Sequence, residues 1–304
     1  MVRIPTVLIL GAGASAPFGF PIGSELREKI LRDFGNDLAP GVEVLTKIGY
    51  SRGEIRSFCE AFRFSGKDSI DAFLERRNTL IEIGKAAIAL EMIPCESLAG
   101  LFKDGNNLYS YLINRYLNAS PAEFTQNKLS VLTYNYDRSF EQYLFTSLKN
   151  SFGLEDYEAA IMVNSIPIVH LHGHLGTLPW QREGGRDYAQ DSTPEAIRQA
   201  SQTIKIIHRP VETYPEFLKA YKLIEKAERL IFLGFGYHED NVKRLKIPWS
   251  DPRREIFGSS FKLTRSEITG INQRLFGGRL KLGNVIGNDS PDALNYLREE
   301  VDLS

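Results

Sequence analysis

The chain has 304 residues, of which 42% are hydrophobic and 25% charged, which is ordinary for a globular protein and allows a substantial core. Its formal net charge of −1 excludes a general attraction to nucleic acid or to an anionic membrane, and no apolar run approaches the length of a membrane span. The only two cysteines, Cys59 and Cys95, cannot supply a zinc site of four thiolates and do not indicate a disulfide scaffold. We expect a cytoplasmic protein without a signal peptide.

A compact aliphatic run at residues 6–10 predicts the first strand, with the composition of a strand buried in a parallel sheet. A glycine-rich loop follows at once and fits a loose dinucleotide-binding pattern; its residues are Gly11, Ala12, Gly13, Ala14, Ser15 and Ala16. Glycine permits a tight turn, and the missing Cβ lets a phosphate approach backbone N–H groups closely. The loop is therefore a candidate phosphate site, although the pattern alone is not specific.

The chain departs from the ordinary Rossmann fingerprint immediately after this loop. Residues 17–21, Pro-Phe-Gly-Phe-Pro, interrupt any helix that begins at Ser15, and the first helix is expected at residues 24–31 with Ser24 as its N-cap. No second strand ending in Asp or Glu follows about 20 residues later, as that fingerprint requires. The sequence therefore disfavours an ordinary dehydrogenase.

Residues 36–126 have helical periodicity and no strand pattern. We interpret this stretch as a helical insertion between strands, and for nearly all of its length we expect a cap without chemistry of its own. The predicted organisation is a single domain, residues 1–304, in which residues 1–35 and 127–304 form a Rossmann-like core around the insertion.

Buried strands and helices alternate after the insertion. Strands are predicted at 129–133, 166–172, 203–207, 229–233, 260–263 and 281–286, and helices at 139–148, 194–200, 214–227 and from Ser290 onward. A polar loop at 177–193 separates two of them. This order predicts an α/β fold: a doubly wound, mostly parallel Rossmann-like sheet with a helical insertion after the first strand-loop-helix unit.

Four predicted strands end in polar or glycine-rich groups. These groups are Gly11 to Gly13, Thr133 to Asp137, His172 with Gly173, and Gly234 to Gly236. The carboxyl ends of parallel strands lie along one edge, where open α/β sheets bind ligands. Each group also has a structural interpretation: the glycines as tight turns, Asn135 and Asp137 as caps of the next helix, and His172 as a satisfied strand-end histidine. The coincidence of all four favours one shared site.

Three histidines alternate at one of these strand ends: His170, His172 and His174. In a continuous strand they would share one face, but Gly173 is expected to end the strand and to leave His172 at the carboxyl edge of the sheet. A metal hydrolase built on the three would need further ligands, and the chain has only five histidines in all. We therefore predict no metal.

The order of these motifs resembles the sirtuin family. Gly-Ala-Gly-x-Ser with a downstream Gly-Phe-Pro is followed by Thr-x-Asn-x-Asp, then by His-Gly, then by a late strand ending in a glycine-rich turn. More closely, the chain resembles the sirtuin-like NAD+ hydrolase domains of bacterial anti-phage defence systems. The resemblance extends from Val7 to about Asn241, with the loop near Gly287 as a further candidate on the adenine side.

The resemblance implies two catalytic residues. Asn135 would hold the nicotinamide ribose or the attacking water, and His172 would be the base that faces the ribose hydroxyls. Asp137 would help to seat the nicotinamide carboxamide. The remaining NAD+-binding residues implied are Gly11, Ala12, Gly13, Ser15 and Ala16 at the pyrophosphate, Pro21 of the Gly-Phe-Pro turn, Thr133 and Tyr134, and Gly234, Phe235 and Gly236 at the adenosine half.

Three departures from the sirtuin deacetylases bear on the acceptor. Two cysteines cannot supply their four-cysteine zinc ribbon, Gly23 and Ser24 replace their Phe-Arg pair, and Tyr134 replaces the glutamine usual between Thr and Asn. These changes argue against an acyl-lysine groove and favour water. The leading hypothesis is an NAD+ glycohydrolase that uses NAD+ as substrate and releases nicotinamide and ADP-ribose, as an abortive-infection type of defence effector does.

Two other hypotheses stay open. The same pocket could serve a protein deacylase or an ADP-ribosyltransferase, or the chain could be a non-catalytic subunit that binds NAD or ADP-ribose within a larger complex. A hydrolase that depletes NAD+ must be held inactive until it is needed, and no separate ligand-sensing domain is evident. We therefore expect a homo-oligomer or a partner protein to gate the activity.

Overall fold

The computed structural model describes residues 1–36, 38–248, 251–283 and 292–303. Six parallel strands form one sheet in the order β3-β2-β1-β4-β5-β6. Their bounds are β1 (Thr6–Leu10), β2 (Leu129–Thr133), β3 (Ile168–His170), β4 (Arg229–Leu233), β5 (Glu255–Gly258) and β6 (Leu280–Leu282). The chain leaves β1 toward β2 and β3, and then returns to place β4 on the other side of β1. This is the doubly wound, Rossmann-like α/β fold that the sequence predicts.

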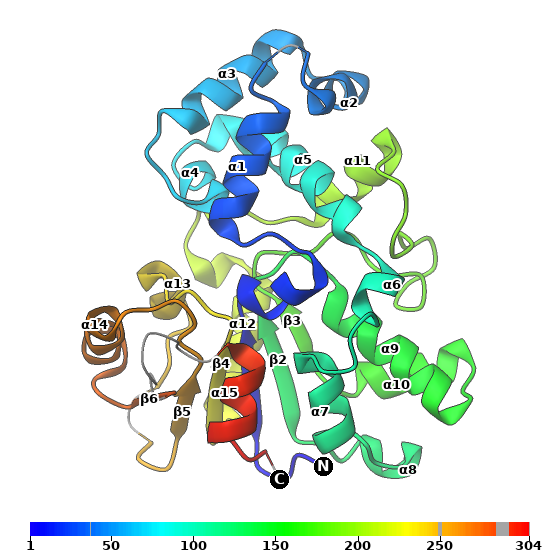
Figure 1. Cartoon of the computed structure of the whole chain (residues 1–304), viewed down its shortest axis with the longest axis vertical. Helices are drawn as coiled ribbons and strands as arrows, with labels where there is room; N and C mark the ends of the chain where they lie inside the picture. The colour runs from blue at the N-terminus through cyan, green and yellow to red at the C-terminus, as the bar shows by residue number, and fades with distance from the viewer. Residues whose placement is uncertain (37, 249–250, 284–291, 304) are drawn as a thin grey trace.

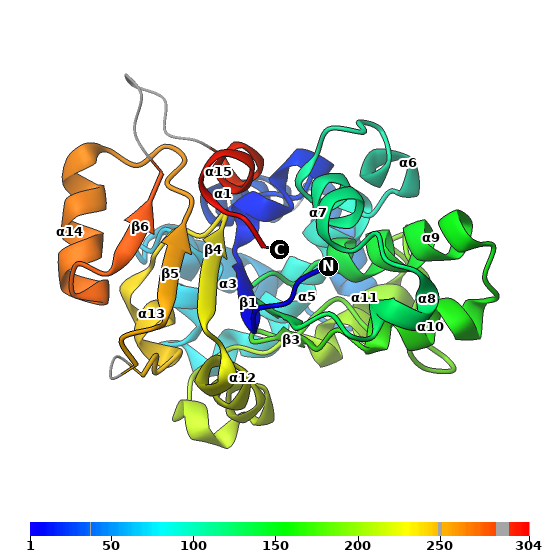
Figure 2. The same cartoon turned by 90° about the horizontal axis from the view of Figure 1, so that it is seen from below.

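Helices cover both faces of this sheet (Figures 1 and 2). The α-helices are α1 (Gly23–Asp33), α2 (Pro40–Ile48), α3 (Arg52–Arg63), α4 (Ile70–Leu74), α5 (Ile81–Met92), α6 (Leu98–Leu101), α7 (Leu108–Tyr116), α8 (Pro121–Phe124), α9 (Ser139–Phe152), α10 (Asp156–Asn164), α11 (Pro194–Thr203), α12 (Pro215–Lys226), α13 (Glu239–Arg244), α14 (Arg265–Phe276) and α15 (Ala293–Glu300). Short 3-10 turns are η1 (Ala12–Ala14), η2 (Ala16–Phe18), η3 (Asn78–Leu80), η4 (Ile93–Cys95) and η5 (Val211–Thr213).

The central strands are aliphatic because they are buried on both faces. Leu8 of β1 pairs with Val131 of β2 on one side and with Ile231 of β4 on the other. Side chains alternate, so that Leu8 joins the core under α1, α5, α7 and α9, whereas Ile9 joins the core under α12 and α14. Figure 2 shows α15 and α12 on opposite sides of β4.

The segment from α2 to α8, which separates β1 from β2, contains helices and no strand among its described residues. Helices α1 to α5 lie beyond the carboxyl ends of the strands, together with α11, which packs on α2 and α5 (Figure 1). The predicted helical stretch at 36–126 is therefore helical, and part of it covers the edge of the sheet where the predicted site lies. Its definition as an insertion within a single domain stays a prediction.

The aliphatic strands were predicted with the bounds observed for β1, β2 and β4. The strand predicted at 166–172 is shorter, because it ends at His170 and Gly173 takes a φ of +69°. The strand predicted at 203–207 is wrong: α11 extends to Thr203, and an isolated antiparallel bridge between Gly173 and Ile204 is the ladder pairing found there.

The end of the chain differs more from its prediction. The strand predicted at 260–263 is wrong, because β5 lies earlier and residues 261–262 form a turn that leads into α14, which was not predicted. α10 and α13 were also not predicted. β6 overlaps the strand predicted at 281–286, and α15 begins at Ala293 with Asp292 as its N-cap. Ser290 and Gly287, to which a helix start and an adenine-side loop were assigned, lie outside the described residues.

Two glycine-rich loops meet where β1 and β4 end. The N–H of Gly11 donates to the carbonyl of Leu233 at 3.0 Å, and the N–H of Gly13 donates to the carbonyl of Gly234 at 2.9 Å. A Cβ on Gly11 would lie 2.6 Å from that same Gly234 oxygen, and one on Gly234 would lie 2.1 Å from the nitrogen of Ala14. These glycines are therefore required by the contact between the loops.

This contact corrects the reason given for the glycines. The sequence argument assigned the space of a missing Cβ to a phosphate, but at Gly11, Gly13 and Gly234 the opposite loop fills that space. Gly236 differs, since no described atom lies within 4 Å of the position of its Cβ.

The two loop glycines Gly234 and Gly236 form a matched test. Gly234 has a φ of +59°, and its Cβ would collide with backbone, so Gly234→Ala should lower the free energy of unfolding by more than about 2 kcal/mol. Gly236→Ala should change it by less than about 0.5 kcal/mol, as at an unconstrained surface position. Urea unfolding of both variants measures the difference, and equal effects would contradict the loop contact.

A buried carboxyl group lies between the packed helices α1 and α5. Burial, and then the nearby carboxylate of Asp33, raise the pKa of Glu91 from 4.5 to about 7. The folded protein thus keeps a proton that the unfolded chain releases above about pH 4.5. Stability from this group is present at low pH and is lost as the pH rises from about 4.5 to 7.

Replacing Glu91 by Gln keeps the shape of the side chain and removes this titration. Between pH 4.5 and 7.5, the free energy of unfolding of Glu91→Gln should rise relative to the wild type by up to about 3 kcal/mol, at about 1.4 kcal/mol for each pKa unit. Urea unfolding at both ends of that range measures it. Glu82→Gln is the control, because Glu82 lies on the same helix and is exposed; parallel pH profiles for wild type and Glu91→Gln would contradict the assignment.

Candidate functional site

Asn135 is held over the first glycine loop. β2 ends at Thr133, whose hydroxyl accepts from the N–H of Asn135 at 3.0 Å. The side-chain Nδ2 of Asn135 donates to the carbonyl of Gly11 at 3.0 Å and to the hydroxyl of Ser15 at 3.2 Å. Because a carbonyl can only accept, the amide nitrogen must face the loop, and Oδ1 is left without a partner among the described residues. The structure thus brings together Gly11, Ser15, Thr133 and Asn135, as the sequence predicts.

The strand-end histidine His170 supports this segment. Its Nδ1 lies 3.0 Å from the carbonyl of Asn135, and its Nε2 lies 2.9 Å from Glu141 Oε1. Both partners accept hydrogen bonds, so the ring holds both protons. Burial alone would lower the pKa of His170, but the carboxylate of Glu141 outweighs it and the pKa is raised. His170 is therefore a cation buried against Glu141.

His174 and His172 lie in different surroundings. The ring of His174 packs against His170 with centroids 5.3 Å apart, and burial, followed by the charge on His170, lowers the pKa of His174 to about 4. His172 turns away from both. The condition for three histidines on one face, a strand continuing to His174, is not met because β3 ends at His170.

His172 contacts a carboxylate from the helical segment. Its Nδ1 lies 3.3 Å from Asp71 Oδ1 at the start of α4, and its ring lies against Tyr134 and Tyr136, with centroids 5.2 and 6.3 Å away. Nε2 is buried and has no hydrogen-bond partner. Asp71 thus places a charged side chain of the helical segment against a predicted catalytic residue; the expectation that nearly all of residues 36–126 have no chemistry of their own stays a prediction.

The segments that carry Asn135 and His172 run side by side. The N–H of Leu171 donates to the carbonyl of Thr133 at 2.8 Å, and that of Leu175 to the carbonyl of Tyr136 at 2.9 Å. The hydrogen bonds of the two predicted catalytic side chains nevertheless go to different partners. Asn135 faces the glycine loop, whereas His172 faces α4.

Asp137 has one satisfied and one unsatisfied oxygen. Oδ1 accepts from the backbone N–H of Ser139 at 3.1 Å and from its hydroxyl, so it caps the start of α9. Oδ2 is buried without a partner, and burial raises the pKa of this carboxyl group. The helix-capping interpretation of Asp137 is therefore confirmed for one oxygen only.

A buried ion cluster follows Asp137 directly. Arg138 donates to both oxygens of Glu96 at 2.9 Å, and Arg186 donates to both at 2.7 Å; all three side chains are fully buried. The cluster ties the polar loop to β2 and to the helical segment. Tyr188 of that loop lies with its ring 5.8 Å from Arg138, and its hydroxyl is buried without a partner. Sequence reasoning missed all four residues.

The second glycine loop packs mainly into the core. The N–H of Gly234 donates to the hydroxyl of Ser259 at 2.9 Å, and Phe235 is buried against Tyr134 and Phe232, each with centroids 5.3 Å away. Ser259, at the carboxyl end of β5, was missed because that strand was not predicted. Tyr134 is fixed by its hydroxyl, which donates to the carbonyl of Asn241 at 2.6 Å.

The other predicted contact residues lie next to the first glycine loop. Ala12 and Ala16 lie in the consecutive turns η1 and η2, which take the place of a helix start. Pro21 is half-buried, two residues after Gly19, which has a φ of +92°, and directly before the N-cap of α1. This geometry agrees with the expected interruption of the helix at residues 17–21.

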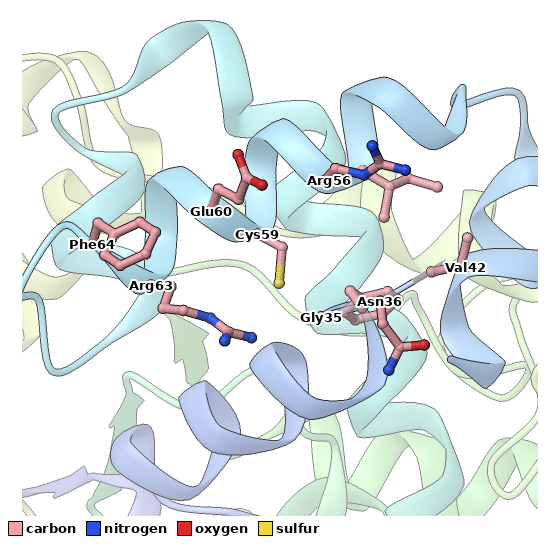
Figure 3. A pocket seen from close by; sticks show the side chains of 10 residues that line it. Gly35, Asn36, Val42, Arg56, Cys59, Glu60, Arg63 and Phe64 are labelled. Carbon is pink, nitrogen blue, oxygen red and sulfur yellow. The ribbon is translucent and has the colours of Figure 1, made fainter. Parts of the chain in front are cut away.

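Two cavities differ in size and in chemistry. The smaller, of about 10 Å³, is lined by Asn135, Asp137 and His170 among others. The larger, of about 370 Å³, lies between α1, α2 and α3 (Figure 3), where Arg63 donates to the carbonyl of Leu31 at 3.4 Å. We assign the candidate site to the smaller cavity because three of the predicted site residues, Thr133, Asn135 and Asp137, line it; His172 and the two glycine loops are not among its lining residues.

The described residues contain no group of three or more His, Cys, Asp or Glu side chains that could hold a metal ion. In the same part of the chain, no helix has the length and apolar character needed to cross a membrane.

A comparison with known protein families matches one part of the chain. Residues 129–246 match the family of the SIR2-like domain. The matched segment runs from β2 to the end of α13, so it contains Asn135, Asp137, His172 and the loop at Gly234, whereas the loop at Gly11 and Asp71 lie outside it. No curated protein matches the chain. Over these residues, the chain is therefore similar to SIR2-like domains.

Proposed function

We propose that this protein is an NAD+ glycohydrolase, which cleaves the bond between nicotinamide and ribose to give nicotinamide and ADP-ribose. One observation carries the proposal. Five buried side-chain atoms of the described residues have no hydrogen-bond partner, and three of them are Asp137 Oδ2, His172 Nε2 and the Tyr188 hydroxyl. Buried polar groups in folded proteins are nearly always paired, so these atoms are suited to bind a ligand.

Hydrolysis of the nicotinamide–ribose bond requires few side chains. The bond between the ribose C1′ and the pyridinium nitrogen breaks through an oxocarbenium-like state, and its electron pair neutralises the departing nicotinamide. Water then bonds to C1′ and loses a proton. His172 Nε2 is the proton acceptor in this proposal, and Asn135 Oδ1, held in place from its amide side, accepts a hydrogen bond from the water or from a ribose hydroxyl.

The nicotinamide end would lie against Asp137 and Tyr188. A primary carboxamide has two N–H donors and one oxygen acceptor. Asp137 Oδ2 offers an acceptor and the Tyr188 hydroxyl offers a donor, both without a protein partner. Burial, and then the charge of Asp137, raise the pKa of Tyr188, so its hydroxyl keeps its proton.

The small volume of the site supports a gated activity. Ligand pockets for molecules of drug size measure roughly 300–1,000 Å³, whereas the cavity at Asn135 measures about 10 Å³. NAD+ would therefore enter only after the helices over the sheet edge have moved. We propose, as the sequence resemblance implies, that a homo-oligomer or a partner protein controls this opening and that the protein is a defence effector.

Incubation of the purified protein with NAD+, followed by mass spectrometry, tests the reaction. We expect nicotinamide and ADP-ribose in equal amounts. Asn135→Ala and His172→Ala should each lower kcat by about 10²-fold or more, because a positioned base or donor contributes about 10²–10⁴. The control is Asn164→Ala, at the exposed end of α10, which should keep full activity.

Other outcomes point to the other hypotheses. Nicotinamide release that requires an acylated peptide would indicate a deacylase. Calorimetric binding of NAD+ that stays intact on long incubation would indicate a non-catalytic subunit. Full activity of both the Asn135 and the His172 variants would reject this site.

A further inference from the structure

We propose that Asp71 is the positioning residue of His172, and that it holds the imidazole with Nδ1 protonated and Nε2 open to the reacting atoms. The inference deepens the proposed function, since its catalytic consequence depends on that reaction. The state of the ring itself does not depend on it. Asp71 lies on α4, roughly 100 residues before its partner, in a segment outside the SIR2-like match.

The contact fixes which nitrogen carries the proton. His172 Nδ1 and Asp71 Oδ1 lie 3.3 Å apart, with 5% of the histidine side chain and 24% of the aspartate side chain exposed. An ionised carboxylate can only accept, so in a hydrogen bond between these two atoms Nδ1 is the donor, and Nε2 of a neutral imidazole then carries the lone pair.

Asp71 is suited to stay ionised. Its own burial would raise the pKa, but His172 and the hydroxyl of Tyr136, which donates to the same Oδ1, outweigh burial and lower it. The neighbours of the ring are uncharged: Tyr134 and Tyr136 flank it, and their pKa values are raised, chiefly by burial.

The position of α4 is itself fixed. Glu75 follows Asp71 by four residues, one helical turn, and accepts from Arg244 of α13 at 2.7 and 2.9 Å. This ion pair ties α4 to the far side of the second glycine loop. The aspartate is therefore placed against His172 by an interaction that is separate from the histidine.

In the proposed reaction, the Asp71–His172 pair accepts the proton that is released. The proton from water, or from a ribose hydroxyl, would go to Nε2, while the Nδ1 proton stays with His172 and Asp71 remains a carboxylate. The imidazolium formed would be stabilised by that negative charge, as in other Asp–His pairs. Without the carboxylate, the ring can turn or take the other tautomer, in which Nε2 donates and cannot accept.

Chemical rescue separates positioning from a structural role. Asp71→Ala should lower kcat by about 10²-fold or more and change KM by less than about threefold. Because the Asp71 side chain is partly exposed, added formate should occupy the space left by the missing carboxylate and raise the kcat of Asp71→Ala at least about tenfold. Asp68→Ala, at an exposed position two residues before the start of α4, is the matched control and should neither lose activity nor respond to formate.

A readout independent of turnover uses the ring nitrogens. Long-range proton–nitrogen NMR correlations, with His172 assigned by comparison with His172→Gln, should show the Nδ1–H tautomer in the wild type and lose it in Asp71→Ala. Asp71→Asn is the second variant, in case the alanine variant does not fold. An unchanged tautomer in the variants, or activity within about threefold of the wild type, would overturn the proposal. If the wild-type protein does not cleave NAD+, the proposed function is rejected. The NMR measurement of the tautomer then decides by itself whether Asp71 positions His172.

Discussion

The hydrogen-bonded contact between the two glycine loops is the constraint on which the site depends. It joins the ends of β1 and β4, the two strands between which the chain changes direction across the sheet. Ligands of open α/β folds bind at this point. Here the contact closes the gap between the strands and presents the carbonyl of Gly11 to the amide of Asn135. The backbone of one loop thus orients a side chain delivered by a third strand.

Some polar side chains around this contact have hydrogen-bond partners within the protein for all their donors, and others keep a polar atom without a partner. His170 and Arg138 use their donors on protein acceptors, and both are charged and buried. Asp137, His172 and Tyr188 each keep one polar atom unpaired. Burying a polar atom without a partner opposes folding, and the proposed ligand would supply partners for these atoms.

The features predicted best from the sequence are those that depend on neighbouring residues in the chain. The strands β1, β2 and β4 are continuous aliphatic runs. The glycine-rich or polar group at the end of each was recognised because it directly follows the strand in the sequence. The short strand β5 carries too few apolar residues to stand out, and β6 was predicted with other bounds. Asp71, Glu96 and Arg186 were missed for another reason: each functions through a partner between 90 and 101 residues away, as for Glu96 with Arg186 and Asp71 with His172. Helix and strand periodicities relate residues only a few positions apart, so they cannot predict such distant pairs. The role of the glycines was misread because only the structure shows which atoms fill the space beside them.

The cluster of Glu96, Arg138 and Arg186 has a consequence for how a nucleotide could reach this edge. One carboxylate faces two guanidinium groups in a fully buried setting, and the two arginines also donate to backbone carbonyls of the polar loop and of the residues just before it. Separating them would strand charge in the interior, at about 3–5 kcal/mol for each broken pair. The loop at 177–193 is thereby anchored to the sheet as a fixed wall. Because Glu96 belongs to the helical segment, the same cluster also holds that segment, and the ion pair of Glu75 with Arg244 holds α4. Opening this edge to a dinucleotide would therefore require at least one of these ion pairs to separate.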